Sequence, residues 1–300
     1  MTLVARHTGR VVRRSRSLLV GVTATFAAGA SLAVGVFAAS DETATVSEPA
    51  VRVDPPSRAL LISDSAWLGI KTYGAKDAMQ GFDHWLDLAS CRRRVTPSCR
   101  NYDGHVPITL LEEVAWRGGA FDTLVVATGY NDSDHNFRSD LDQIVTMTRD
   151  HGYRRIVWVT LRSNVTYTSP GNAGFAEVFA RNNQTLRELV DSGDYPEIVI
   201  ADWATYARDR HEWFARDGIH LRGAGPWAAA DFVSRKVAHL DGRPCPADGS
   251  PGSVCPDPDA TGPITDLYDL YPIGEPNPTA GFHMEWEGRG AWPDGPWWLR

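Results

Sequence analysis

Three short polar segments of the sequence carry residue types suited to acyl transfer. Ser63-Asp64-Ser65 and Gly129-Tyr130-Asn131-Asp132 each follow a short apolar run, and Asp217-Gly218-Ile219-His220 lies further along the chain. Acyl transfer needs a nucleophile, a base that takes its proton, a carboxylate that orients the base, and donors for the oxyanion. The three segments together contain one candidate for each of these roles.

The spacing within the segments suggests how the roles are divided. Because Asp217 and His220 are three residues apart, the carboxylate can reach one imidazole nitrogen while the other nitrogen faces Ser65. The Asn131 amide can donate to a developing oxyanion, and Gly129 lets the backbone turn tightly toward the site. Each segment alone is also ordinary turn or capping chemistry. The hypothesis therefore depends on their joint occurrence, in order.

The surrounding pattern predicts an α/β fold. Strand candidates occur at residues 59–62, 84–88, 123–127, 156–160 and 198–201, and most are short apolar or β-branched runs, typical of strands covered on both faces. Segments with helical spacing lie between them, one opened by a capping box from Thr109 to Glu112. This alternation predicts a three-layer α/β/α sandwich around a central parallel five-stranded sheet. The polar segments then follow strand ends on one sheet edge, where such folds place their ligands.

The three segments resemble the motifs of the SGNH (GDSL-type) hydrolase superfamily over roughly residues 57–242. Ser63-Asp64-Ser65 stands where that family has Gly-Asp-Ser, and the other two segments match its Gly-x-Asn-Asp and Asp-x-x-His. The resemblance implies Ser65 as nucleophile, Asn131 as oxyanion donor, His220 as base and Asp217 as its partner. It also implies a flavodoxin-like sheet and the absence of any metal or other cofactor.

Two positions depart from the family pattern. Ser63 replaces the usual first glycine, and the residue remains small. The family's second glycine, whose N–H binds the oxyanion, should follow the second strand, where residues 89–93 read Ala-Ser-Cys-Arg-Arg. We expect the N–H of Cys91 or Ser90 to replace it, with Gly104 as the less favoured alternative. The Ser65 N–H completes the predicted oxyanion hole.

The four cysteines form two close pairs in the sequence. Four cysteines allow three pairings, and the local one, Cys91–Cys99 with Cys245–Cys255, is the simplest. A zinc site is disfavoured because neither pair has CxxC spacing or a histidine at ligand spacing. Disulfides agree with a location outside the cytoplasm.

The amino-terminal region predicts export. Five arginines between residues 6 and 16 precede an uncharged apolar run at 18–38, which ends in a small-residue junction. We expect residues 1–38 to be a signal peptide or, alternatively, a membrane anchor, and residues 39–56 to be a linker. Both alternatives place the rest of the chain outside the cytoplasm.

Charge and composition constrain the partners and the tail. The formal charge is −7, and removing the five arginines of residues 1–38 gives −7 − 5 = −12, which argues against nucleic acid as a partner. Residues 243–300 contain eleven of the nineteen prolines and Trp286, Trp292, Trp297 and Trp298. They predict an irregular extension, either a disulfide-pinned tail or an aromatic sugar-binding surface.

The sequence thus predicts an exported serine esterase that acts on an O-acyl group of a carbohydrate or cell-envelope polymer. Two alternatives stay open. One is an O-acyltransferase that passes the acyl group to a sugar hydroxyl with the same residues. The other is a non-catalytic glycan-binding protein on a hydrolase scaffold.

Overall fold

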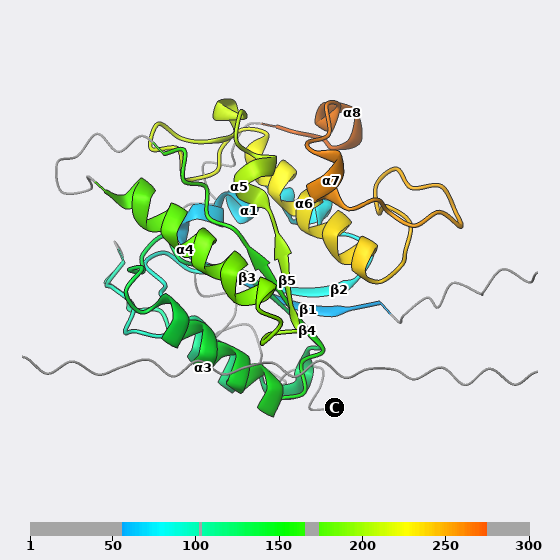
Figure 1. Cartoon of the computed structure of the whole chain (residues 1–300). Helices are drawn as coiled ribbons and strands as arrows, with labels where there is room; N and C mark the ends of the chain where they lie inside the picture. Colours follow the sequence, from blue (N-terminus) through cyan, green and yellow to red (C-terminus); the bar gives the residue numbers. More distant parts are fainter. Residues whose placement is uncertain (1–55, 102–103, 166–173, 275–300) are drawn as a thin grey trace, which may run out of the picture. The chain divides into compact units, whose positions relative to one another are not determined.

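A parallel five-stranded sheet forms the centre of the fold, as the sequence predicts (Figure 1). The structure is a computed structural model that describes residues 56–101, 104–165 and 174–274. The strand order is β2-β1-β3-β4-β5, and every neighbouring pair is parallel. The strands are β1 (Arg58–Ser63), β2 (Asp83–Leu88), β3 (Thr123–Ala127), β4 (Arg155–Val159) and β5 (Ile198–Ala201).

Helices occupy the connections between the strands. The four helices of two or more turns are α2 (Leu110–Arg117), α3 (Phe137–Asp150), α4 (Phe175–Asp191) and α6 (Gly225–Leu240). The one-turn helices are α1 (Gly69–Thr72), α5 (Trp203–Tyr206), α7 (Pro258–Thr261) and α8 (Leu267–Leu270). The 3₁₀ turns are η1 (Ser65–Trp67), η2 (Ala75–Ala78), η3 (Gly118–Ala120) and η5 (His211–Trp213).

Alternate strand residues build two separate cores, one on each face of the sheet. Leu61, Val125 and Val157 pack on the face covered by α1 and α6. Their neighbours Leu60 and Leu124 pack on the opposite face, against α2, α3 and the second half of α4. Burying each such side chain stabilises the fold by about 1.5–3 kcal/mol. This double coverage explains why the strands read as continuous apolar runs and gives the three-layer α/β/α sandwich.

Local signals in the sequence set the helix boundaries. Helix α2 begins at the predicted capping box, where Thr109 Oγ1 accepts from the Glu112 N–H at 3.1 Å and the Glu112 carboxylate accepts from the Thr109 N–H at 2.7 Å. An N-cap of this kind is worth roughly 1 kcal/mol. Helix α2 supports the loop that follows β2 because the Leu110 N–H donates to the carbonyl of Arg93 at 2.9 Å.

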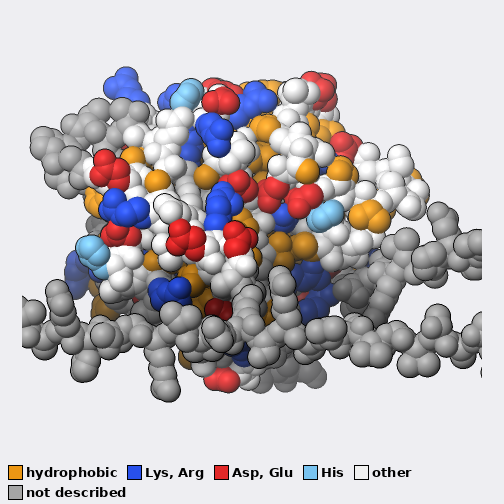
Figure 2. All heavy atoms as spheres, in the orientation of Figure 1, with side chains coloured by type: hydrophobic (Ala, Val, Ile, Leu, Met, Phe, Trp, Pro, Cys, Tyr) orange, Lys and Arg blue, Asp and Glu red, His pale blue; other side chains and the backbone are white. Residues whose placement is uncertain are grey.

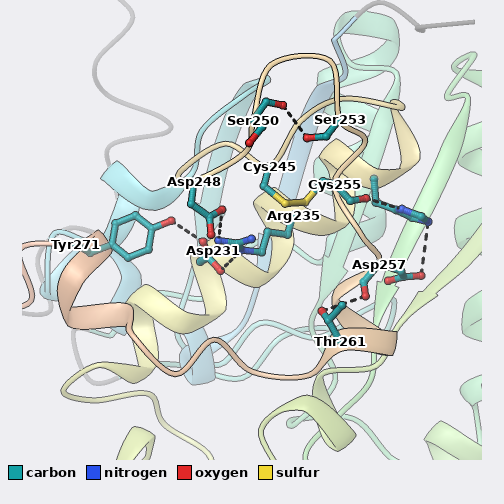
Figure 3. The surroundings of a disulfide bond; sticks show 11 residues. Asp231, Arg235, Cys245, Asp248, Ser250, Ser253, Cys255, Asp257, Thr261 and Tyr271 are labelled. Atoms are coloured by element: carbon teal, nitrogen blue, oxygen red, sulfur yellow. Dashed lines mark hydrogen bonds and ion pairs between the residues drawn. A yellow bond between two sulfur atoms is a disulfide. The ribbon is translucent and has the colours of Figure 1, made fainter. Parts of the chain in front are cut away.

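Hydrogen bonds and ion pairs attach the described part of the carboxyl-terminal extension to α6 (Figure 3). A disulfide joins Cys245 to Cys255, as the sequence predicts. Asp231 of α6 accepts from the Tyr271 hydroxyl at 2.5 Å and from Arg235 at 2.8 Å. Apart from α7 and α8, residues 243–274 are irregular. The tryptophans of residues 286–298 lie outside the described residues.

Acidic side chains at the start of α7 extend this attachment to β5. The buried ammonium of Lys236 on α6 contacts Asp257 and Asp259, each at 2.8 Å. Asp259 also accepts the N–H of Asp202, which directly follows β5, at 2.8 Å. The extension therefore packs on the same core as residues 57–242.

The outer surface mixes charges of both signs. On the face drawn in Figure 2, acidic and basic side chains are interspersed among small apolar patches. No helix within the described ranges is long and apolar enough to cross a membrane. The apolar run at residues 18–38 lies outside those ranges.

Candidate active site

Ser65 lies immediately beyond the carboxyl end of β1 and opens the turn η1. Its Oγ is 3.0 Å from Nε2 of His220. Ser63, the other serine of the segment, is fully buried, and its hydroxyl donates to the carbonyl of Ala127 at 2.8 Å. The hydrogen bonds therefore separate the two serines: Ser63 joins β1 to β3, whereas Ser65 faces the imidazole.

His220 is oriented by Asp217. The His220 Nδ1 and one carboxylate oxygen of Asp217 are 2.6 Å apart. The other carboxylate oxygen accepts the N–H groups of Ile219 at 2.8 Å and His220 at 3.1 Å. The Leu221 N–H donates to the carbonyl of Ala66 at 3.0 Å, which ties this loop to η1. Ser65, His220 and Asp217 thus form one hydrogen-bonded chain.

The contact between the two side chains lowers the pKa of Asp217 and raises the pKa of His220. Burial alone would raise the pKa of Asp217, but its hydrogen bonds to His220 and to two backbone N–H groups lower that pKa to about 2. The hydrogen bond to Asp217 raises the pKa of His220 against the opposing effect of burial, and the charges of Asp217 and Asp64 add to the rise. A carboxylate fixed on Nδ1 leaves Nε2 as the proton acceptor toward Ser65.

Asp64 accepts hydrogen bonds from the backbone next to Ser65 and from the backbone of the Gly129–Tyr130 turn. Its buried carboxylate accepts the N–H groups of Ala66, Gly129 and Tyr130, each at 2.9 Å. Burial raises its pKa, and these three hydrogen bonds oppose the rise. Gly129 has φ +155°, and a Cβ there would lie 3.1 Å from Leu161. Asp64 and Gly129 together place the turn that carries Asn131.

Three potential oxyanion donors follow three adjacent strands. Ser63 pairs with Leu88 of β2 and with Ala127 of β3, so these strands end at the same level. Within the described residues, no hydrogen-bond acceptor is found for the N–H groups of Ser65 and Cys91. The Asn131 amide donates one hydrogen to the carbonyl of Arg92 at 3.2 Å and has a second to offer.

The backbone at Cys91 adopts a conformation that glycine prefers. Cys91 has φ +66° and is, among the described residues, the one non-glycine residue with positive φ. That conformation favours glycine by roughly 1–2 kcal/mol. The disulfide from Cys91 to Cys99, which the sequence predicts, closes the loop, and the Cys99 N–H donates to the Cys91 carbonyl at 3.2 Å. The geometry favours Cys91 as the loop donor, and Gly104 lies thirteen residues further along the chain.

Buried arginines hold the loop that follows Cys91, and the sequence reasoning missed them. The side chain of Arg92 donates to the carbonyl of Asp87 at 2.7 Å, to its carboxylate at 2.8 Å and to the Ile108 carbonyl at 3.1 Å. Arg94 contacts Asp140 at 3.3 Å and Asp132 at 3.7 Å. A run of arginines directly after a strand, in an acidic chain, was the available signal.

A cavity of about 620 Å³ is lined in part by Asn131, whereas Ser65 and His220 are not among its lining residues. Its size lies within the range of small-molecule sites. Its lining is divided almost equally between polar and apolar surface, and the lining residues include Arg93, Thr96, Asn131, Ser133, Asn136 and Phe175. Asn136 is the N-cap residue of α3, yet its side chain makes no capping hydrogen bond. Its amide is therefore available to a ligand.

In the part of the chain that the structure describes, no cluster of His, Cys, Asp or Glu could hold a metal ion. The predicted site residues are instead bonded to one another or to the backbone. The sheet order, with a serine, an asparagine and an Asp/His pair on loops at one edge, decides the fold type. The chain has an SGNH hydrolase-like fold.

Comparisons with known proteins gave only structural matches. No protein-family model and no curated protein matches this SGNH-like chain. The catalytic domain of a Streptococcus pneumoniae peptidoglycan O-acetyltransferase A is 22% identical, with 59% of this chain and 90% of that chain covered and a TM-score of 0.43. A Sinorhizobium meliloti carbohydrate acetylesterase is 14% identical, with 61% and 100% covered and a TM-score of 0.44.

A GDSL-like lipase from Bacteroides thetaiotaomicron is 8% identical, with 60% of this chain and 87% of that chain covered and a TM-score of 0.44. Identity and structural similarity are low in all three cases. The chemistry proposed for the SGNH-like chain therefore follows from its own hydrogen bonds.

Proposed function

We propose that this protein is an exported serine esterase that hydrolyses an O-acyl ester, with a carbohydrate or cell-envelope polymer as the alcohol. The observation that carries the proposal is the hydrogen-bonded chain from Ser65 through His220 to Asp217. A serine hydroxyl bonded to an oriented imidazole is the arrangement that generates a nucleophile at neutral pH.

The proposed reaction has two halves. Ser65 Oγ attacks the ester carbonyl carbon while His220 Nε2 takes the hydroxyl proton, and Asp217 stabilises the resulting imidazolium. The N–H groups of Ser65 and Cys91 and the Asn131 amide bind the tetrahedral oxyanion. The alcohol leaves with the proton from His220. A water molecule, activated by His220, then releases the acid and restores Ser65.

The chemistry of the cavity supports a hydroxylated substrate. The side chains of Thr96, Ser133 and Asn136 face it as neutral hydrogen-bonding groups. Arg93 faces Asp132 and Asp140, and the buried Arg94 bridges both carboxylates, so the local charge is balanced. A neutral group with many hydroxyls can exchange hydrogen bonds with the polar part of this wall.

Export accords with the two disulfides, which form and persist in oxidising compartments. Determining the amino terminus of the purified protein tests whether residues 18–38 are cleaved or remain as an anchor.

The experiment compares the wild type with Ser65→Ala on a short-chain aryl ester and on an acetylated sugar. We expect rapid release of acid by the wild type and a loss of about 10³-fold or more in the variant. Wild-type rates in Ser65→Ala would contradict the assignment of Ser65 as the nucleophile. Adding an unacylated sugar tests the transferase alternative: acylated sugar indicates transfer, and free acid alone indicates hydrolysis.

The binding-protein alternative makes a different prediction for the same samples. A non-catalytic glycan-binding protein would show no ester cleavage in the wild type and no labelling of Ser65 by a fluorophosphonate. Labelling of Ser65 in folded wild-type protein would exclude it.

A further inference from the structure

Arg162 carries a buried guanidinium that lies three residues beyond β4. Its side chain is almost fully buried, at 1% exposure. In residues 56–101, 104–165 and 174–274, no carboxylate pairs with it. It donates instead to the carbonyls of Gly218 at 2.7 Å and Arg208 at 3.4 Å and contacts Nδ1 of His211 at 3.1 Å. A buried cation without a counter-ion is unfavourable, so a compensating role is expected.

The shortest of these contacts falls inside the turn between Asp217 and His220. Gly218 has φ +73°, and a Cβ there would lie 2.8 Å from Nη1 of Arg162. Both the backbone conformation and the approach of the guanidinium therefore require glycine at this position. The absence of a side chain at Gly218 leaves room for the Arg162 guanidinium. The hydrogen bond from Arg162 to the Gly218 carbonyl holds the start of the turn in place.

Arg162 also connects the turn to the opposite side of the site. Its backbone N–H donates to the Tyr130 hydroxyl at 2.7 Å, and the Tyr130 N–H donates to Asp64 beside the nucleophile. Its guanidinium lies 4.3 Å from the ring centre of Phe214, which pairs with Leu221 just after His220. The Arg162 side chain thus holds the Asp217–His220 turn, and its backbone N–H connects that turn through Tyr130 to Asp64.

We propose that Arg162 is a positioning residue, which fixes the Asp217–His220 turn so that the carboxylate stays on Nδ1 and Nε2 stays on Ser65. This inference rests on the proposed serine esterase function. Arg162 makes no contact with Ser65 or with the His220 ring in the structure, so its effect passes through the Gly218 carbonyl. A displacement of about 1 Å at such a turn is enough to cost 10²-fold in rate.

The test compares Arg162→Met and Arg162→Lys with Arg235→Met. Arg235 is a matched control because it is also a buried arginine, yet it bonds to Asp231 and Asp248, away from the triad. We expect Arg162→Met to lower kcat on an aryl ester by about 10²-fold with little change in KM. Arg162→Lys keeps one donor for the Gly218 carbonyl and should lose about tenfold. Arg235→Met should lose stability and retain kcat.

A second measurement is independent of turnover. The 2.6 Å contact between His220 Nδ1 and Asp217 predicts a strongly deshielded ring proton in the NMR spectrum of the wild type. That resonance should weaken or move upfield in Arg162→Lys and stay in place in Arg235→Met. If Arg162→Met does not fold, Arg162→Lys and this resonance decide the question.

Two results would overturn the positioning role. One is wild-type kcat and an unchanged resonance in folded Arg162→Lys or Arg162→Met. The other is an equal loss of kcat in Arg162→Met and Arg235→Met, which would indicate general destabilisation. A wild type that hydrolyses no ester would instead refute the proposed function, and the resonance would still test how Arg162 positions the turn.

Discussion

The two sides of the site are built in different ways. On the proposed base side, the side chains bond directly to one another, Ser65 to His220 and His220 to Asp217. On the proposed oxyanion side, Cys91 and Asn131 share no direct bond and depend on neighbouring groups: a disulfide, the Arg92 carbonyl and the Arg92 side chain. Groups that react with one another leave a motif in the sequence, whereas the supports of a backbone donor leave almost none.

The largest effect should come from breaking the base side. Asp217→Asn places a donor opposite Nδ1 and favours the wrong imidazole tautomer, so kcat should fall by about 10³–10⁴-fold with the fold intact. Steady-state hydrolysis of an aryl ester measures this. The exposed Asp209 provides a control, Asp209→Asn, that should retain activity. A loss of less than about tenfold in Asp217→Asn would contradict the tautomer argument.

Removing one donor from the oxyanion side should have a smaller effect. Asn131→Ala deletes one of three proposed donors, and kcat should fall by about 10²–10³-fold while KM changes little. The KM–kcat split separates this from loss of substrate binding. Unchanged kcat in the folded variant would remove Asn131 from the oxyanion hole. A rise in KM alone would assign the residue to the cavity instead.

The backbone conformation of Cys91 can be tested without its sulfur. Two double variants, Cys91→Gly/Cys99→Ser and Cys91→Ala/Cys99→Ser, both remove the disulfide, and each should lose about 2–3 kcal/mol of stability. Glycine tolerates φ +66° and alanine does not, so we expect near-wild-type kcat with glycine and a loss of about tenfold with alanine.

The control for these variants is Cys245→Ser/Cys255→Ser, which removes the other disulfide and should lower stability without lowering kcat. Equal turnover in the glycine and alanine variants would show that positive φ at Cys91 has no role in presenting its N–H.

The smallest effect on turnover is expected for the substitution of Glu113, a buried residue of α2. Burial and the nearby charge of Asp87 raise the pKa of Glu113 to about 8. A group whose pKa is raised in the folded state stabilises the fold fully below its unfolded pKa and loses that contribution as pH rises through the folded value. The free energy of unfolding should therefore fall between about pH 5 and pH 8.

Glu113→Gln should flatten that decline, by at most about 1.4 kcal/mol per pH unit, and leave kcat at pH 7 unchanged. Urea unfolding at a series of pH values measures the slope. The exposed Glu177 supplies the control Glu177→Gln, whose slope should match the wild type. An unaltered slope in Glu113→Gln would mean that Glu113 does not titrate in this window.

The comparison also shows what the sequence could predict. Four of the five strands were predictable because apolar runs report burial on both sides, although the run expected at 156–160 ends at Val159. The edge strand β2 reads Asp-His-Trp-Leu-Asp-Leu and is mostly half-buried. Ser65, Asn131, Asp217 and His220 were predictable as candidates because each sits next to a strand end or beside its partner in the chain.

The residues that hold the proposed catalytic loops in place could not be predicted from the sequence, for physical reasons. A positive φ at Cys91 depends on the disulfide and on the loop around it, which no residue pattern encodes. Arg92 and Arg162 look like surface charges in a sequence, because their burial depends on carbonyl groups supplied by loops far away in the chain. Backbone acceptors exist at every position and therefore leave no signal of their own.

The central claim is that Ser65 forms a covalent acyl-enzyme with the help of His220. Mass spectrometry of the intact protein after treatment with a fluorophosphonate, followed by peptide mapping, tests it most directly. We predict a single adduct on the peptide that contains Ser65, formed far more slowly in His220→Ala and absent in Ser65→Ala. An unlabelled wild type, or equal labelling of Ser65→Ala at another residue, would contradict the claim.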